Sequence, residues 1–212
     1  MSKLVYGVGL NDVKGGYKLP SYRRWTKMLE RCYKKNNGAL VCNEWLAFSR
    51  FNQWYNFKEK QLASVGYDIE QLVMDKDLLA IDGLVYSPQT CVFLPPVINT
   101  FLSNCQPKKS RDKAKEFGLP QGVCIDHTAK QKPYRIKTIG RSKQTIIYFS
   151  TPEDAYCYRL HLRCKELERL LLTYKKLLKQ QCAYGKLAQL THLENMMNYE
   201  TLQLLCLEAQ DI

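Results

Sequence analysis

The sequence predicts an α+β protein: helices flank a strand–loop–strand–helix segment, then a three-stranded antiparallel sheet packs on a long helix, and a C-terminal helix follows. Apolar residues recur at helical spacing between residues 20 and 60 and again after residue 151, and short apolar runs bounded by turn residues lie between them. Hydrophobic residues make up 45% of the 212 residues, which is enough for a packed core.

Two N-terminal helices are predicted from this spacing. The first follows Pro20 with Ser21 as its N-cap and ends at residues 36–38, and its polar face carries Arg23, Arg24, Lys27 and Arg31. The second runs from about Glu44 to Phe57. An aromatic stripe on it predicts a core face rather than a base-stacking surface, and consists of Trp45, Phe48, Phe51, Trp54 and Tyr55.

The strand–loop–strand–helix segment is predicted between residues 71 and 102. Its strands are Gln71–Leu79 and Thr90–Leu94, and Pro95-Pro96 begin the helix because proline is tolerated in a first helical turn. Charged residues at the end of the first strand and an amide in the helix are the arrangement expected of a metal site, and they are Asp75, Lys76, Asp77 and Asn99.

The second half of the chain begins with a polar, basic stretch, which we interpret as a linker that becomes ordered on a phosphate backbone; a short surface helix is the alternative. Three strands joined by basic turns are then expected at Gly122–Ile125, Tyr134–Ile139 and Thr145–Phe149. Thr151 and Pro152 start a long helix, which Gly185 is expected to interrupt. The resulting organisation is a domain, a linker, a second domain and a C-terminal helical segment, at residues 1–104, 105–118, 119–180 and 181–212.

The final helix, from Leu187 to Leu207, is expected to pack back on the protein or to form a homodimer seam. Nine cysteines occur without any C-x-x-C pair, so they predict small buried residues in a reducing compartment rather than a zinc site. No apolar run approaches the ~20 residues that span a bilayer, and no signal peptide is evident. We therefore expect a cytoplasmic protein.

The positive charge is concentrated in one part of the chain. The net charge is +12, and residues 105–180 alone carry +11, whereas residues 181–212 carry −3. Such a concentration predicts a surface that binds a polyanion, with nucleic acid as the favoured partner. A solubilising face is the alternative, although such faces usually intersperse both signs.

Several motifs follow one another in the first hundred residues, namely Tyr6–Asp12, Trp45–Trp54, Asp75–Asp77, Tyr86–Phe93 and Asn99. Over roughly residues 4–104 this order resembles bacteriophage HNH-type homing endonucleases of the subgroup with Asp-Lys-Asp in the first strand. The resemblance implies a ββα unit in which Asp75 and Asn99 hold Mg²⁺, or another divalent cation such as Mn²⁺, against the scissile phosphate. It also places Thr90 near the residue that braces the loop.

The family's histidine base is replaced by Lys76, and no histidine precedes His127. Lys76 would act as a base only with a strongly lowered pKa, which two flanking carboxylates oppose. Asp77 is the alternative base, although strand alternation places it on the face of Asp75. Two hypotheses remain open at this point: an active nuclease, and an inactive scaffold in which Asp75, Lys76 and Asp77 form an ion cluster.

Further motifs at Gly122-Val123, Tyr134–Lys137 and Tyr148–Tyr156 resemble an APETALA-type DNA-binding domain over about residues 118–170. The resemblance implies three antiparallel strands packed on one helix. Alternation independently places Arg135 and Lys137 on one face of their strand, opposite Tyr134, Ile136 and Thr138. The expected DNA contacts are Lys108, Lys109, Arg111, Lys130, Lys132, Arg135, Lys137, Arg141 and Lys143.

These observations lead to a first hypothesis of a site-directed, Mg²⁺-dependent endonuclease that acts on double-stranded DNA and not on a small molecule. The alternative is a catalytically inactive, nuclease-derived regulator that binds DNA sequence-specifically. A third hypothesis is a protein that binds RNA or coats nucleic acid without sequence preference.

Overall fold

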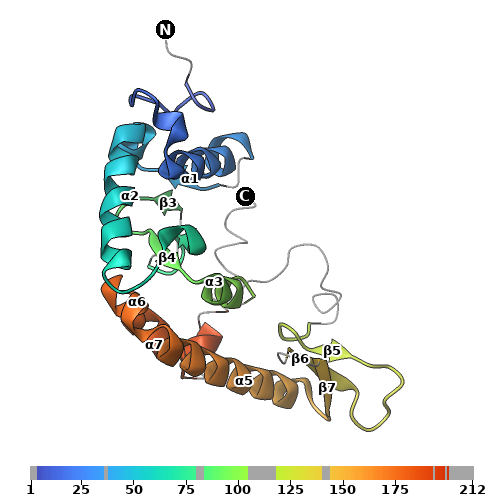
Figure 1. Cartoon of the computed structure of the whole chain (residues 1–212). Coiled ribbons are helices and arrows are strands. Elements are labelled where there is room, and N and C mark those ends of the chain that lie inside the picture. The colour runs from blue at the N-terminus through green and yellow to red at the C-terminus, as the bar shows by residue number, and fades with distance from the viewer. Residues whose placement is uncertain are drawn as a thin grey trace. The chain divides into compact units, whose positions relative to one another are not determined.

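The computed structural model of the chain describes residues 4–35, 38–79, 84–104, 118–139, 144–192, 194–198 and 200 (Figure 1). The chain forms two compact units. Of the described residues, the first unit contains those up to Phe101 together with the segment Tyr174–Lys186, and the second contains those from Leu102 to Thr173 and from Leu187 to Glu200. Helices and small sheets occur together, so the predicted α+β class is confirmed.

The helices of the first unit build an aromatic core. Helix α1 (Pro20–Leu29) continues as a π-helical turn (Glu30–Lys34), and helix α2 spans Phe48–Ala63. The core face predicted for the second helix is confirmed, because four of its five aromatic residues are at most 1% exposed: Trp45, Phe48, Phe51 and Tyr55. Its predicted start is wrong, since Asn43–Leu46 form a separate 3-10 turn and Ala47 is extended.

Short strands connect these helices. Strand β1 (Leu40–Val41) pairs in parallel with β3 (Val85–Tyr86), and β2 (Val73–Asp75) pairs antiparallel with β4 (Val92–Leu94). Helix α3 (Pro96–Ser103) follows β4 after one residue. The β1–β3 pair was not predicted, and β2 is shorter than expected because a 3-10 turn (Ile69–Gln71) precedes it and a turn follows it.

A later segment of the chain completes the first unit. Helix α6 (Lys175–Gln180) packs against α2. Directly after it, the Gln181 side chain accepts a hydrogen bond from the Phe93 N–H at 2.7 Å and donates one to the Phe93 carbonyl. Since β4 pairs with β2 along its other edge, this amide satisfies backbone groups that would otherwise be buried without partners.

The second unit contains a three-stranded antiparallel sheet packed on a long helix, as predicted. Its strands are β5 (Cys124–Ile125), β6 (Tyr134–Ile139) and β7 (Gln144–Phe149), in that order, and helix α5 spans Pro152–Thr173. The N-cap of α5 is confirmed: the Thr151 hydroxyl accepts the N–H of Asp154 at 3.1 Å and donates to its carboxylate at 2.7 Å. Val123, Ile136 and Ala155 form the core between sheet and helix.

The predicted interruption at Gly185 is wrong. Gly185 lies within helix α7 (Tyr184–Gln189), whereas the long helix already ends at Thr173; a second break, before α7, contains Cys182, which adopts a positive φ of 58°. The C-terminal part of the second unit is anchored to α5 by Glu200, which is buried. Its carboxylate lies 3.1 Å from Arg159 and 3.3 Å from Arg163, and accepts a hydrogen bond from the Tyr156 hydroxyl at 3.0 Å.

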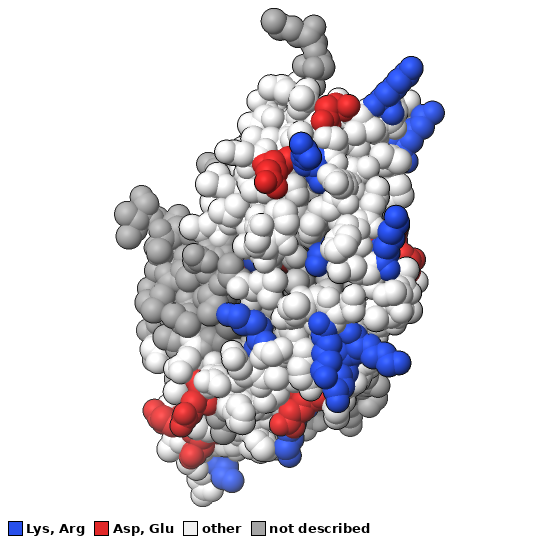
Figure 2. Space-filling model, turned by 90° about the vertical axis from the view of Figure 1, so that its left-hand side faces the viewer, with Lys and Arg blue, Asp and Glu red and all other residues white. Residues whose placement is uncertain are grey.

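In the described ranges no helix is long and apolar enough to cross a membrane. The described cysteines carry no disulfide, and only part of them match the expectation of burial: Cys32, Cys91 and Cys164 are buried, whereas Cys124, Cys157 and Cys182 are exposed. On the face shown in Figure 2, groups of Lys and Arg side chains alternate with acidic side chains.

Candidate functional site

Asp75 ends strand β2 and is buried, with 9% of its surface exposed. Its Oδ1 accepts hydrogen bonds from the backbone N–H groups of Asp77 at 3.1 Å and Leu78 at 2.9 Å. These bonds turn the chain away from the sheet, which explains why the strand stops at this residue. Strand alternation therefore does not extend to Asp77, so Asp77 is not placed on the face of Asp75 by alternation.

The environment of Asp75 fits a cation ligand. Burial raises the pKa of this carboxyl to about 6, and the neighbouring charge of Asp77 acts in the same direction. Within the described part of the chain, nothing donates a hydrogen bond to Oδ2. A buried carboxylate with one open oxygen is a group that a hard divalent cation would stabilise in its charged form.

Lys76 and Asp77 contact each other. The Lys76 ammonium forms an ion pair with Asp77 Oδ1 and lies 5.5 Å from the centre of the Tyr86 ring. Its side chain is 14% exposed, whereas that of Asp77 is 35% exposed. An ammonium held by a carboxylate is a poor proton acceptor, and Asp77 is the more accessible of the two to a water molecule.

Asn99 lies in the first turns of α3 and is half-buried, and its N–H donates to the Pro95 carbonyl at 3.1 Å. Helix α3 follows β4 in the chain, and β4 pairs with β2, the strand that ends at Asp75. No cluster of three or more His, Cys, Asp or Glu side chains with metal-binding geometry occurs among the described residues. The pair proposed from the sequence, Asp75 and Asn99, is not such a cluster, because asparagine is not one of these four residue types.

The loop before β4 is braced by Thr90. The Thr90 hydroxyl accepts the N–H of Ser87 at 3.0 Å and donates to the Val85 carbonyl at 2.7 Å. The Thr90 N–H in turn donates to the Ser87 hydroxyl at 3.3 Å. This side chain therefore ties the loop to strand β3.

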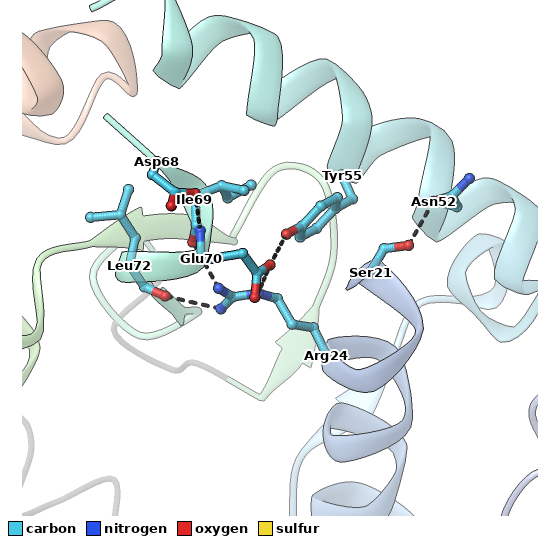
Figure 3. A network of polar contacts seen from close by, with 8 residues as sticks. All are labelled: Ser21, Arg24, Asn52, Tyr55, Asp68, Ile69, Glu70 and Leu72. Atoms are coloured by element: carbon cyan, nitrogen blue, oxygen red, sulfur yellow. Dashed lines mark hydrogen bonds and ion pairs between the residues drawn. The ribbon is translucent and has the colours of Figure 1, made fainter. Parts of the chain in front are cut away.

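Arg24 positions the segment that leads into β2 (Figure 3). Its terminal nitrogens donate to the carbonyls of Leu72 at 2.9 Å and Ile69 at 2.7 Å, and its Nε lies 3.5 Å from the Glu70 carboxylate. Tyr55 of α2 donates its hydroxyl to the same carboxylate. Arg24 was expected only on the polar face of its helix, whereas in the structure it belongs to a network that joins α1, α2 and the segment before β2.

The sheet of the second unit shows the two faces predicted by alternation. Ile136 is buried against Ala155, and Tyr134, Ile147 and Phe149 pack around them. On the opposite face the register brings Arg135 beside Tyr148 and Lys137 beside Ile146. Lys130 and Lys132 lie in the exposed turn before β6. Five further predicted contacts lie outside the described residues: Lys108, Lys109, Arg111, Arg141 and Lys143.

Two further residues belong to this face, Asp126 and Tyr148, and neither was predicted as a member of a site. Asp126 accepts hydrogen bonds from Thr128 and from the Tyr148 hydroxyl, and it pairs with Arg135. An Asp directly after a strand and two residues before a Thr is a local signal for such a turn. Its link to Tyr148 depends on strand pairing and could not be read from the sequence.

Comparison of the chain with protein-family models, with curated proteins and with solved structures found no match.

Proposed function

We propose that the chain is a site-directed DNA endonuclease that hydrolyses a DNA phosphodiester. The observation that carries the proposal is the state of Asp75: a buried carboxylate with an open oxygen, at the end of strand β2, which pairs with β4. Residues 75–99 follow the order of the HNH motifs, and the braced loop at Thr90 agrees with that order.

Asp75 and Asn99 would hold the divalent cation, for which Mg²⁺ is the natural candidate because both ligands offer oxygen. Bound there, the cation would stabilise the negative charge that develops on the leaving oxygen. Asp77 is the candidate general base, since its side chain is more exposed than that of Lys76. Lys76 would then hold Asp77 in place through their ion pair.

A catalytically inactive DNA-binding regulator is the second candidate. The observation that favours it is the ion pair itself: Lys76 occupies the position of the family's histidine, and its ammonium is bound to Asp77. In this alternative the three charged residues stabilise the turn after β2, and the sheet of the second unit carries the function.

The deciding experiment incubates the full chain with supercoiled plasmid DNA that carries candidate sites, with Mg²⁺ or with EDTA. We expect nicking or cleavage with Mg²⁺ only, and loss of at least ~100-fold in rate for Asp75→Ala and Asn99→Ala, the order of magnitude of one electrostatic catalytic group. As controls, Glu59→Ala removes a carboxylate and Asn56→Ala removes a carboxamide from exposed positions on α2, and both variants are expected to cleave normally.

Two further variants identify the base. Asp77→Asn is expected to abolish cleavage, whereas Lys76→Met should retain part of it. The reverse order would assign the base to Lys76. Absence of any cleavage by the wild-type protein, with DNA binding intact, would support the inactive regulator instead.

A further inference from the structure

The solvent-facing side of the three-stranded sheet carries a carboxylate among its basic residues. Asp126 follows β5 directly, and its N–H donates to the Pro133 carbonyl at 2.7 Å, which fixes it beside the start of β6. Arg135 of β6 and Tyr148 of β7 are directly opposite each other in the sheet. The three side chains Asp126, Arg135 and Tyr148 therefore lie together on the face away from α5.

Asp126 is held through both of its oxygens. Oδ1 accepts hydrogen bonds from the Thr128 N–H at 3.1 Å and the Thr128 hydroxyl at 2.6 Å, and Oδ2 accepts one from the Tyr148 hydroxyl at 3.1 Å. The bonds from Thr128 and Tyr148 also lower the pKa of Asp126, so the group is charged at neutral pH. A carboxylate fixed in this way can orient a neighbouring cation.

Arg135 meets this carboxylate through its Nε. The Nε–Oδ2 distance is 3.9 Å, and within the described residues this buried Nε forms no hydrogen bond. Closure by about 1 Å would convert the ion pair into a hydrogen bond. With Nε directed at Asp126, the two terminal nitrogens stay available as a planar pair of donors, which matches O6 and N7 of guanine.

An acidic group on this face needs a physical reason, because residues 105–180 otherwise carry a strong positive excess. A carboxylate next to DNA weakens the attraction to phosphate. This loss of affinity is offset where the carboxylate holds an arginine side chain in its DNA-binding conformation before binding. The conformational entropy of that side chain is then not lost on binding. Lys137, which forms no ion pair within the described part of the chain, is suited to phosphate contact instead.

We propose that Asp126 is a positioning residue for Arg135: together with Tyr148 it holds the guanidinium so that its terminal nitrogens read one guanine in the major groove of double-stranded DNA. This inference rests on the proposed DNA-directed function and adds the residue that sets base preference. Arg135 touches the base, and Asp126 acts only through Arg135.

The test is a selection from double-stranded DNA with a randomised central segment, carried out with the full chain and followed by affinity measurements on the selected duplex and on a scrambled one. The wild-type protein is expected to select a guanine that Arg135→Ala does not select. Asp126→Asn should lose the preference at the same position by roughly tenfold or more, the value of one bidentate contact. It should bind the scrambled duplex at least as tightly as the wild type, because one negative charge is removed.

If Asp126 had a purely structural role, Asp126→Asn would weaken binding to both duplexes. A weaker affinity for the selected duplex with an unchanged or stronger affinity for the scrambled one therefore distinguishes the positioning role. The double variant Asp126→Asn/Arg135→Ala should show no further loss beyond Arg135→Ala, because both act through one contact. Glu168→Gln is the matched control: it removes one negative charge from an exposed position on α5 and should leave the base preference unchanged.

Retention of the wild-type guanine preference by Asp126→Asn would overturn the inference. If that variant fails to fold, Tyr148→Phe decides, since it removes a single hydroxyl: a reduced preference at the same guanine supports the inference and an unchanged preference overturns it. If the wild-type chain cleaves DNA but binds it without any base preference, the inference about Asp126 is overturned and the proposed endonuclease function stands. Absence of DNA binding and cleavage together would contradict the proposed function itself.

Discussion

Asp12 caps helix α2 from a distant part of the chain. Ala47, the residue before the helix, has no side chain that accepts hydrogen bonds. The Asp12 carboxylate instead accepts them from the Ser49 N–H at 2.8 Å and the Ser49 hydroxyl at 2.5 Å. The N-terminal motif Tyr6–Asp12 thereby fixes the first turn of α2, and negative charge there also interacts favourably with the helix dipole.

We expect Asp12→Ala to lower the free energy of unfolding by about 1 kcal/mol, the usual contribution of a helix cap. Burial acts to raise the pKa of Asp12, but the hydrogen bonds from Ser49 outweigh it and lower the pKa below 3.8. The contribution is therefore fully present above pH 3.8 and is lost as the pH falls below it.

Tryptophan fluorescence during urea unfolding measures this effect, because Trp25, Trp45 and Trp54 all belong to the first unit. The difference between wild type and Asp12→Ala should shrink at acidic pH. Glu59→Ala, exposed on the same helix, is the control and should show no such difference. Equal midpoints for wild type and Asp12→Ala at neutral pH would contradict the capping role.

At the scale of elements, a single acidic residue, Glu200, holds the C-terminal part of the second unit against α5. Glu200 faces Arg159, Arg163 and Tyr156, which recur along one side of the helix. Removal of the carboxylate would leave two arginines, each about 15% exposed, without their shared partner. Breaking a buried ion pair on one side is strongly destabilising.

Glu200→Gln is therefore expected to lower the stability of the second unit by about 3 kcal/mol. Far-UV circular dichroism during urea unfolding should show an earlier transition, while tryptophan fluorescence, which reports the first unit, should remain unchanged. Glu194→Gln, which is exposed, serves as the control. A shift of both signals together would argue against a local anchor.

Elements with local signals could be predicted from the sequence. The cap at Thr151 and the alternation along β6 act within a few residues, and both were found. The β1–β3 pair could not be predicted, because each strand has two residues and the partners are distant in the chain. The contacts of Arg24 and the end of β2 at Asp75 were missed for a related reason: side chains bind backbone groups there and override the local pattern.

For the molecule as a whole, the uneven charge predicts strongly salt-dependent DNA binding. Lys137→Ala is expected to weaken binding to all duplexes alike and to reduce the slope of log K against log [NaCl] by about 1, the effect of one phosphate contact. Fluorescence anisotropy at several NaCl concentrations measures the slope. Lys165→Ala, exposed on α5, is the control, and an unchanged slope for Lys137→Ala would remove Lys137 from the interface.

The return of the chain to the first unit has a consequence for biosynthesis. Gln181 binds both backbone groups of Phe93, and α6 packs on α2, yet the whole second-unit segment Leu102–Thr173 is translated between them. On the ribosome, the unit that carries Asp75 and Asn99 therefore remains incomplete until the sheet and α5 have been made. A protein truncated after Phe101 would lack α6 and Gln181. The first unit can therefore complete its folding only after the candidate DNA-binding sheet has been synthesised.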